Sequence, residues 1–257
     1  MARVALPRGD EKRAWVEEMF DRVAPSYERV NRVISLGQDR KWRRDVVRAL
    51  ALPPASVVLD VACGTGDLCR ELGNAKHRPV GVDLSAGMLE VARERAAAAG
   101  VAKLVDLRLG DLRTPPVEGR YRLVTSPFRA LLHMETDADR RAALHAARSL
   151  VADGGRFVFD VFEPGAEDIA DTHRRWLERE PGIWERADWD ERTRTLILRV
   201  RGDDGETEMS LAWLSVPEWE ALLGECGFEV EAVHGWFDGQ PYRGGEDSVW
   251  ICTPSVS

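Results

Sequence analysis

Between residues 56 and 161 the sequence alternates short apolar runs with segments of helical character. A single helix between successive strands requires right-handed crossovers, which build a parallel sheet covered by helices on both faces. The alternation therefore predicts a doubly wound α/β fold. The predicted strands are VVLDVA, PVGVDL, LVDLRLGD, YRLVTSPF and GRFVFDVF, which begin at residues 57, 79, 104, 121 and 155.

The flanking segments follow other patterns. Residues 1–54 have helical spacing interrupted by prolines, which predicts an N-terminal helical cap. After the fifth strand, WERADWDERTRTLILRV and TEMSLAWLSV predict antiparallel strands joined by a glycine-containing turn. Residues 163–214 are therefore expected to form an insertion that acts as a lid. A helix from Pro217 to Cys226 and the strands FEVEAVHGW and SVWICT complete a single domain over residues 1–257.

The composition narrows the classes of partner. A formal net charge of -8 offers no general attraction to phosphate backbones, so nucleic acid is disfavoured. No apolar run approaches the ~20 residues of a membrane span, and the charged start MARVALPRGDEKR lacks the apolar core of a signal peptide. A cytoplasmic protein is therefore expected. The four cysteines form no CxxC pair, so neither a metal site nor a disulfide framework is expected.

The first predicted strand leads into the turn DVACGTGDL, in which Asp60 precedes Gly64 and Gly66. In a doubly wound sheet this turn usually forms the floor of the ligand site. A dinucleotide fingerprint would place a third glycine where Cys69 stands, and no phosphate loop ending in G-K-S/T is present. A carboxylate at Asp60 would repel a pyrophosphate but suits an ammonium or a sulfonium.

Two further acids end the next strands. Asp83 lies at a distance downstream that suits the hydroxyls of a ribose, and Asp111 in LGDL could reach the edge of an adenine. A ligand with an adenine, a ribose and a cationic amino-acid tail satisfies all three positions. S-adenosylmethionine has this chemistry.

The motifs DVACGTGDL, VGVDLSAGMLEVAR and LGDL, in this order and spacing, resemble those of class I S-adenosylmethionine-dependent methyltransferases, with Ala62 in place of the first glycine of the commonest pattern. The segment MFDRVAPSYERVNRVISLGQDRKWRR resembles the entry segment of the ubiquinone and menaquinone C-methyltransferase family, with Glu28 where that family usually has Asp. After the fourth strand that family has an Arg-Asn signature, whereas this chain has SPFRALLHM. The tail is more similar to methyltransferases that act on small metabolites, sugars or amines.

The resemblance implies a Rossmann-like sheet of seven strands with the last strand antiparallel, and S-adenosylhomocysteine as the product. It also implies which residues contact the cofactor, although Met88 is equally suited to a helix core. These residues are Tyr27, Arg43, Asp60, Ala62, Cys63, Gly64, Gly66, Asp83, Leu84, Met88, Asp111 and Leu112.

Candidate catalytic groups follow the fourth and fifth strands. Histidine side chains in general titrate near neutrality, so His133 could act as a general base, and Asp160 could hold an ammonium or accept a proton. Each also has a structural interpretation, as a hydrogen-bonded helix-face histidine and as an acid buried at a strand end. The acceptor is expected to contact Phe128, Arg129, Trp184 and Tyr242.

The sequence thus predicts a methyltransferase that modifies an O, N or C centre of a small-molecule metabolite, with no metal. Two alternatives stay open. One is a C-methyltransferase of a quinone precursor, and the other is an S-adenosylmethionine-binding scaffold that has lost methyl transfer. The identity of the acceptor and the oligomeric state, including a homodimer, are left open.

Overall fold

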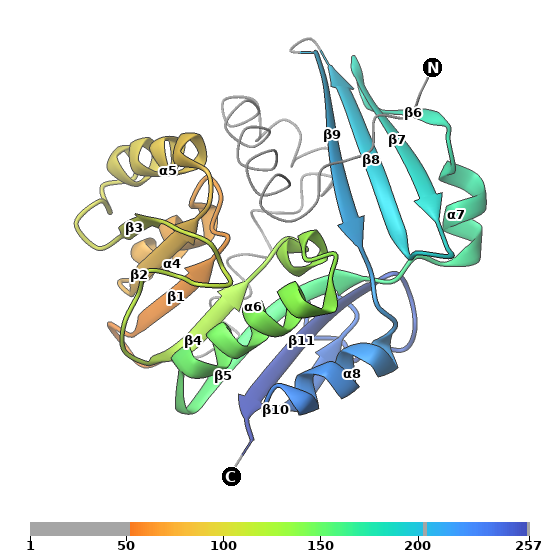
Figure 1. Ribbon diagram of the computed structural model, residues 1–257. Coiled ribbons are helices and arrows are strands. Elements are labelled where there is room, and N and C mark those ends of the chain that lie inside the picture. Colours follow the sequence, from red (N-terminus) through yellow and green to blue (C-terminus); the bar gives the residue numbers. More distant parts are fainter. Residues whose placement is uncertain (1–51, 203–204, 256–257) are drawn as a thin grey trace.

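A computed structural model describes residues 52–202 and 205–255 of the chain, so nearly all of the predicted N-terminal cap lies outside the described residues (Figure 1). Seven strands form one sheet in the order β10-β11-β5-β4-β1-β2-β3. Strands β1 to β5 pair in parallel, and β11 is antiparallel to both of its neighbours, as the resemblance implies. The strands are β1 (Val57–Val61), β2 (Arg78–Asp83), β3 (Asp106–Leu109), β4 (Tyr121–Ser126), β5 (Val151–Phe162), β10 (Phe228–His234) and β11 (Asp247–Pro254).

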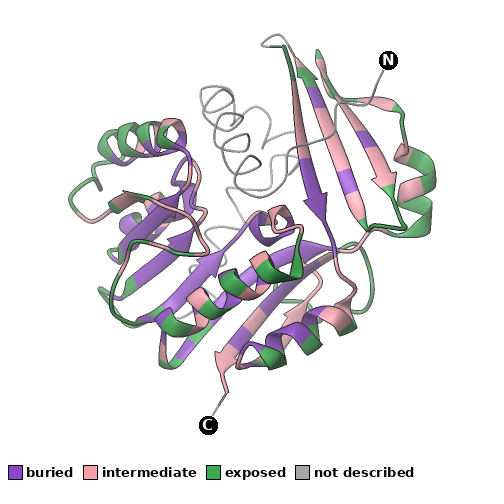
Figure 2. Cartoon of the chain, viewed as in Figure 1, coloured by how far each residue is buried: buried purple, intermediate pink, exposed green. Residues whose placement is uncertain are grey.

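Helices cover both faces of this sheet, which confirms the doubly wound prediction. Because side chains alternate along a strand, Leu59 and Phe157 belong to one apolar cluster and Val58 and Val158 to another. Helices α6 and α8 pack into the first cluster, and α4 packs into the second. Figure 2 shows the resulting buried zone along β1, β4 and β5. The helices are α4 (Asp67–Asn74), α5 (Ala86–Ala98), α6 (Asp137–Leu150) and α8 (Val216–Glu225).

A second sheet follows β5, in the order β6-β7-β8-β9 with all pairs antiparallel. It confirms the predicted antiparallel insertion and stands beside the main sheet in Figure 1. Its elements are α7 (Ala166–Thr172), β6 (Trp176–Glu180), β7 (Ile183–Asp190), β8 (Thr195–Gly202) and β9 (Gly205–Ala212).

The segment WERADWDERTRTLILRV forms two strands rather than one, because the chain reverses between β7 and β8. The Asp190 carboxylate accepts hydrogen bonds from the amides of Arg192 and Thr193, at 3.1 and 3.2 Å. Arg194 then takes a left-handed conformation, with φ of 51°. This turn is built by an acid and two polar residues without glycine or proline, so it gives no strong turn signal in the sequence.

Tryptophans join the two sheets and fill the core. The ring of Trp189 on β7 meets Phe162 at the end of β5 edge-on, with centroids 6.0 Å apart, and meets Trp213 at 5.5 Å. Trp219 and Trp250 are almost fully buried around Phe159. Much of the tryptophan content therefore serves packing rather than acceptor binding. Within the described residues, no helix combines the length and the apolar character that crossing a membrane requires.

Candidate functional site

The carboxyl ends of β1, β2, β4 and β5 meet at one edge of the main sheet. Strand β1 has β2 on one side and β4 on the other, and the chain leaves these strands toward helices on opposite faces. This is the switch point at which doubly wound sheets bind ligands. The turn after β1, the turn after β2 and the loop 127–133 all lie there.

The turn after β1 relies on left-handed backbone at three positions. Ala62, Gly64 and Gly66 have φ of 60°, 53° and 71°. At Gly66 a Cβ would lie 2.8 Å from the Cβ of Ala92 on α5. Gly66 therefore allows close packing of α4 against α5, a role other than the ligand approach expected of it. Its contact with the cofactor stays a prediction.

Asp83 fixes the turn after β1 against the turn after β2. Its Oδ2 accepts a hydrogen bond from the Gly64 amide at 2.7 Å, and its Oδ1 accepts one from the Ser85 amide at 2.9 Å. The residue is 9% exposed. Ser85 in turn caps α5, since its Oγ accepts from the Met88 amide at 3.0 Å. The Asp83 carboxylate thus has one orientation, at the position where the sequence predicts ribose binding.

Asp60 is fully buried at the end of β1. Its Oδ1 accepts from the Thr125 hydroxyl on β4 at 2.9 Å, and its Oδ2 faces the Cys69 thiol on α4 at 3.6 Å. A hydrogen bond with Cys69, together with burial, raises the pKa of the Cys63 thiol well above its usual range. The two thiols therefore stay neutral, and the negative charge at this corner belongs to carboxylates.

The turn after β1 and the carboxylates around it fit a cationic nucleoside better than a phosphorylated one. The Gly64 amide points to Asp83 and the Gly66 amide donates to the Cys63 carbonyl at 3.0 Å, so both are used inside the turn. A pyrophosphate at a helix N-terminus needs such amides directed outward. The buried carboxylates of Asp60 and Asp83 lie beside the start of α4 and would repel a pyrophosphate, whereas Asp67 is already paired with Arg70 and Arg95. A sulfonium and an ammonium are favoured by the same charges, and the residues therefore fit S-adenosylmethionine.

At the predicted adenine end, Asp111 is engaged in an ion pair. Arg113 binds its Oδ2 through Nη2 at 2.7 Å and also binds Asp139. This pairing was not foreseen, and it leaves the contact of Asp111 with adenine a prediction. Leu84 and Leu112 are half-buried near the same edge, while Met88 is 1% exposed.

The loop after β4 contains two successive strained residues. Phe128 and Arg129 have φ of 63° and 59°, a left-handed region that costs non-glycine residues about 1 to 2 kcal/mol each. The Arg129 amide donates to Asp160 Oδ2 at 3.2 Å, and the Phe128 amide also bonds this carboxylate. Asp160 on β5 therefore holds the strained turn, which is a common device at functional sites.

Asp160, one of the predicted catalytic residues, lies in an environment that strongly favours its neutral form. Burial raises its pKa to about 7, although the Arg129 guanidinium opposes this shift. Arg129 Nη2 itself binds Asp247 Oδ1 on β11 at 2.5 Å, and its guanidinium lies 4.7 Å from the centre of the Phe162 ring. His133 ends the 3-10 helix η1 (Ala130–His133) in the same loop and is half-buried.

The other predicted acceptor contacts are spread more widely. Tyr242 lies between β10 and β11, and its hydroxyl donates to the Gly245 carbonyl at 3.0 Å. Trp184 is 39% exposed on β7, where its strand neighbours are Glu178 and Arg201. This position does not place it beside the loop 127–133. Tyr27 and Arg43 lie outside the described residues.

Sequence reasoning missed two side chains of the site. Thr125 binds Asp60 only because β4 pairs with β1, and Asp247 meets Arg129 across 118 positions of the chain. No local pattern indicates either contact. The N-cap role of Ser85 could have been found from LSAGML, in which a serine precedes the predicted helix.

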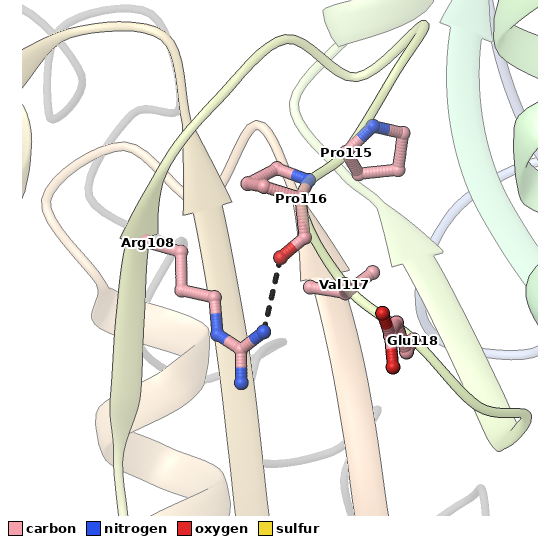
Figure 3. Close-up of a pocket in the computed structure, with 5 residues that line it drawn as sticks. All are labelled: Arg108, Pro115, Pro116, Val117 and Glu118. Carbon is pink, nitrogen blue, oxygen red and sulfur yellow. Dashed lines mark hydrogen bonds between the residues drawn. The ribbon is translucent and has the colours of Figure 1, made fainter.

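A cavity of about 500 Å³ lies elsewhere, at the outer edge of the sheet beside β3 (Figure 3). Arg108 crosses it and donates to the Pro116 carbonyl at 3.0 Å. Its lining contains none of the predicted site residues: it consists of Arg108, Pro115, Pro116, Val117 and Glu118. In the part of the chain that the structure describes, no group of three or more His, Cys, Asp or Glu side chains is arranged to hold a metal ion.

Comparison with known proteins gives the family. The model of the ubiE/COQ5 methyltransferase family matches residues 8–177. Demethylmenaquinone methyltransferase of Symbiobacterium thermophilum is 44% identical over 114 residues, which are 43% of this chain and 45% of that protein. The ubiquinone/menaquinone biosynthesis C-methyltransferase UbiE of Geotalea daltonii is 32% identical over 156 residues, 59% of this chain and 65% of that protein. The chain thus spans less than two thirds of the length of these relatives.

Solved structures agree with the fold. The CcbJ methyltransferase from Streptomyces caelestis has a TM-score of 0.75 at 24% identity, covering 84% of this chain and 90% of that one. SAM-bound CalS10, an amino pentose methyltransferase from Micromonospora echinaspora, has a TM-score of 0.61 at 24% identity. The match covers 87% of this chain and 97% of that one. Such identities support the fold alone. The match of the family model over more than half of the chain, with the ordered motifs and the seven-stranded sheet, shows that this chain belongs to the ubiE/COQ5 methyltransferase family.

Proposed function

We propose that the protein is an S-adenosylmethionine-dependent methyltransferase that acts on a small molecule. The observation that carries this proposal is the corner formed by Asp60 and Asp83, whose buried carboxylates lie beside a turn with inward-directed amides. This corner attracts a cation and disfavours a phosphate. Membership of the ubiE/COQ5 family supports the same conclusion.

The roles of the residues follow from their positions. The oriented Asp83 carboxylate accepts hydrogen bonds from ribose hydroxyls, and the turn around Gly64 lies along the methionyl part. When bound, S-adenosylmethionine supplies an electrophilic methyl group on its sulfonium. The chain's contribution is to hold the acceptor in line with that methyl, to exclude water, and to remove a proton where the acceptor requires it. His133 and Asp160 are the groups that could do so.

The second sheet is proposed to act as a lid over the acceptor. Its β7 is anchored to the end of β5 by the contact between Trp189 and Phe162. The end of β5 also carries Asp160, so a movement of the second sheet would change the position of Asp160. Contacts of Tyr27 and Arg43 with the cofactor remain part of the proposal.

A second candidate is C-methylation of a quinone precursor. The names of the relatives favour it, since they include demethylmenaquinone methyltransferases. The family match ends at residue 177, within β6, so β7 to β11 lie beyond it. The part of the chain that the match covers contains the cofactor corner but not the whole acceptor side.

Calorimetry and a transfer assay test the proposal. We expect S-adenosylhomocysteine to bind the purified chain while NAD does not, and labelled methyl from S-adenosylmethionine to appear in a small-molecule acceptor. Demethylmenaquinone belongs in the acceptor panel, because its methylation would select the second candidate. Binding of NAD in preference to S-adenosylhomocysteine would refute the proposal. Tight binding without transfer to any acceptor would favour a scaffold.

A further inference from the structure

One oxygen of Asp160 is buried without a partner. Its Oδ2 accepts the Arg129 amide of the strained turn after β4, whereas its Oδ1 has no geometrically defined hydrogen-bond partner among the described residues. The residue is 7% exposed. Buried polar atoms are almost always hydrogen-bonded, so an unpartnered carboxylate oxygen calls for an explanation.

Within residues 52–202 and 205–255, acidic groups outnumber basic ones around this oxygen. Arg129 is the cation that acts on Asp160, and it already binds Asp247. Glu246 adds a third carboxylate near the same guanidinium, and burial raises its pKa as well. Among the described residues, three carboxylates therefore surround Arg129, and Arg179 also acts on one of them, Glu246. A buried carboxylate without its own counter-charge favours a cation or a proton.

The strand register places this oxygen on the cofactor side of the sheet. Asp60 pairs with Thr125 on β4, and Thr125 pairs with Val158 on β5. Because side chains alternate, Asp160, two residues after Val158, emerges on the same face as Asp60. It is two strands away from Asp60, at the same carboxyl edge. This is the position expected of an acceptor group beside the cofactor corner.

We propose that Asp160 Oδ1 binds the ammonium group of an amine acceptor and takes up one of its protons. The inference rests on the proposed function and names its substrate class. In the step, an N–H bond breaks, an O–H bond forms on Oδ1 and the nitrogen keeps the electron pair. The negative carboxylate and the positive ammonium become a neutral acid and a neutral amine. The amine nitrogen then has the lone pair that a methyl acceptor needs, and product release returns the proton to solvent.

Amine chemistry fits this site better than quinone chemistry. The carbon of a quinone precursor carries no positive charge and no N–H group, so it would add neither a counter-charge to the acidic cluster nor a donor for Oδ1. An ammonium supplies both the missing charge and the missing hydrogen-bond donor for Oδ1. Burial also raises the pKa of Asp160 to about 7, which is suited to accepting a proton at neutral pH.

The test measures binding of cationic probes to the full chain saturated with S-adenosylhomocysteine. Benzylammonium is compared by calorimetry with benzyl alcohol, and butylammonium with butanol, so that each pair differs in charge at similar shape. Asp160→Asn retains an oxygen for the amides of the turn but replaces Oδ1 with a donor. Glu231→Gln removes an exposed carboxylate that binds Arg156 on the far part of the sheet, and it serves as the matched control.

We expect wild type at pH 8 to bind the ammonium members about tenfold or more tightly than the alcohols, as a charge-assisted hydrogen bond provides. The preference should disappear in Asp160→Asn, persist in Glu231→Gln, and weaken in wild type below about pH 7 as Asp160 gains a proton. Equal binding of amine and alcohol by wild type, or a preference that survives in Asp160→Asn, would overturn the inference. Failure to bind S-adenosylhomocysteine would instead overturn the proposed function itself.

Discussion

The amide of Gly64 donates a hydrogen bond of 2.7 Å to Oδ2 of Asp83, 19 positions further along the chain. This contact joins the turn after β1 to the end of β2. It gives Asp83 a structural function in addition to the predicted ribose contact. A substitution at Asp83 therefore acts on the shape of the glycine turn as well as on the ligand.

We expect Asp83→Ala to weaken S-adenosylhomocysteine binding about a hundredfold or more, because hydrogen bonds to a buried carboxylate contribute ~1.5 to 3 kcal/mol each. Asp83→Asn keeps an acceptor for one amide, so its affinity for S-adenosylhomocysteine should fall less. Calorimetry measures both affinities, and hydrogen exchange at the Gly64 amide reports the loosened turn. Asp106→Asn, at an exposed acid paired with Arg108, is the control. Unchanged affinity in Asp83→Ala would remove this residue from the cofactor site.

Gly66→Ala should destabilise the protein by about 2 to 4 kcal/mol. The new Cβ would meet the Cβ of Ala92 at 2.8 Å, and alanine is also strained at φ of 71°. Gly119→Ala is the matched control, because Gly119 has φ of 92° and nothing within 4 Å of its Cβ position. The free energy of unfolding of that control should fall only by the ~1 kcal/mol that backbone strain costs.

Urea unfolding gives the free energy of unfolding for each variant. Adding Ala92→Gly to Gly66→Ala should recover the part of the loss that comes from the steric clash, in a double-mutant cycle. Equal losses in Gly66→Ala and Gly119→Ala would show that backbone strain, not helix packing, requires the glycine.

The parts of this fold that could be predicted from the sequence depend on local patterns. The alternation from residue 56 to 161 fixes the order of strands and helices, because each apolar run and each helical period is continuous in the chain. The reversal at Arg192 was missed because polar side chains make it without glycine. Acids at strand ends could be predicted as site residues for the same reason, since a strand end is a local feature.

The interactions of those acids could not be predicted, because they depend on the pairing of distant segments. Asp60 meets Thr125 through the β1–β4 register, and Arg129 meets Asp247 only after β11 inserts beside β5. The assignment of Asp111 to adenine overlooked Arg113, two residues away, whose guanidinium folds back onto it. A local ion pair of this kind competes with solvent and is only weakly indicated by sequence.

We expect His133→Ala to lower turnover while S-adenosylhomocysteine affinity stays nearly unchanged. A general base contributes about 100- to 10,000-fold to the rate, and His133 lies in the loop after β4 rather than in the turn around Gly64. Initial rates with an acceptor that wild type methylates, together with calorimetry, separate the two quantities. A parallel loss of affinity, turnover and unfolding free energy would instead indicate that His133 supports the fold.

Asp160 should make the stability of the protein depend on pH in the direction opposite to an ordinary ion-paired acid. Its pKa is about 7 in the native state against 3.8 for an unperturbed aspartate, so the native state binds this proton more tightly than the unfolded state. The stabilisation by this group is fully present below about pH 4 and is lost as pH rises through 7. A difference of this size corresponds to roughly 4 kcal/mol at 1.36 kcal/mol for each pH unit.

Asp160→Asn removes that titration, so its unfolding free energy minus that of wild type should rise by up to about 4 kcal/mol between pH 4 and pH 8. Urea unfolding at a series of pH values measures this difference, and subtracting wild type cancels the titration of the other groups. Glu231→Gln should show a small change of opposite sign, because the hydrogen bond from Arg156 lowers the pKa of Glu231. If Asp160→Asn and wild type lose stability in parallel, Asp160 is ionised in the native state and has a counter-charge. The amine acceptor would then no longer be needed to balance it.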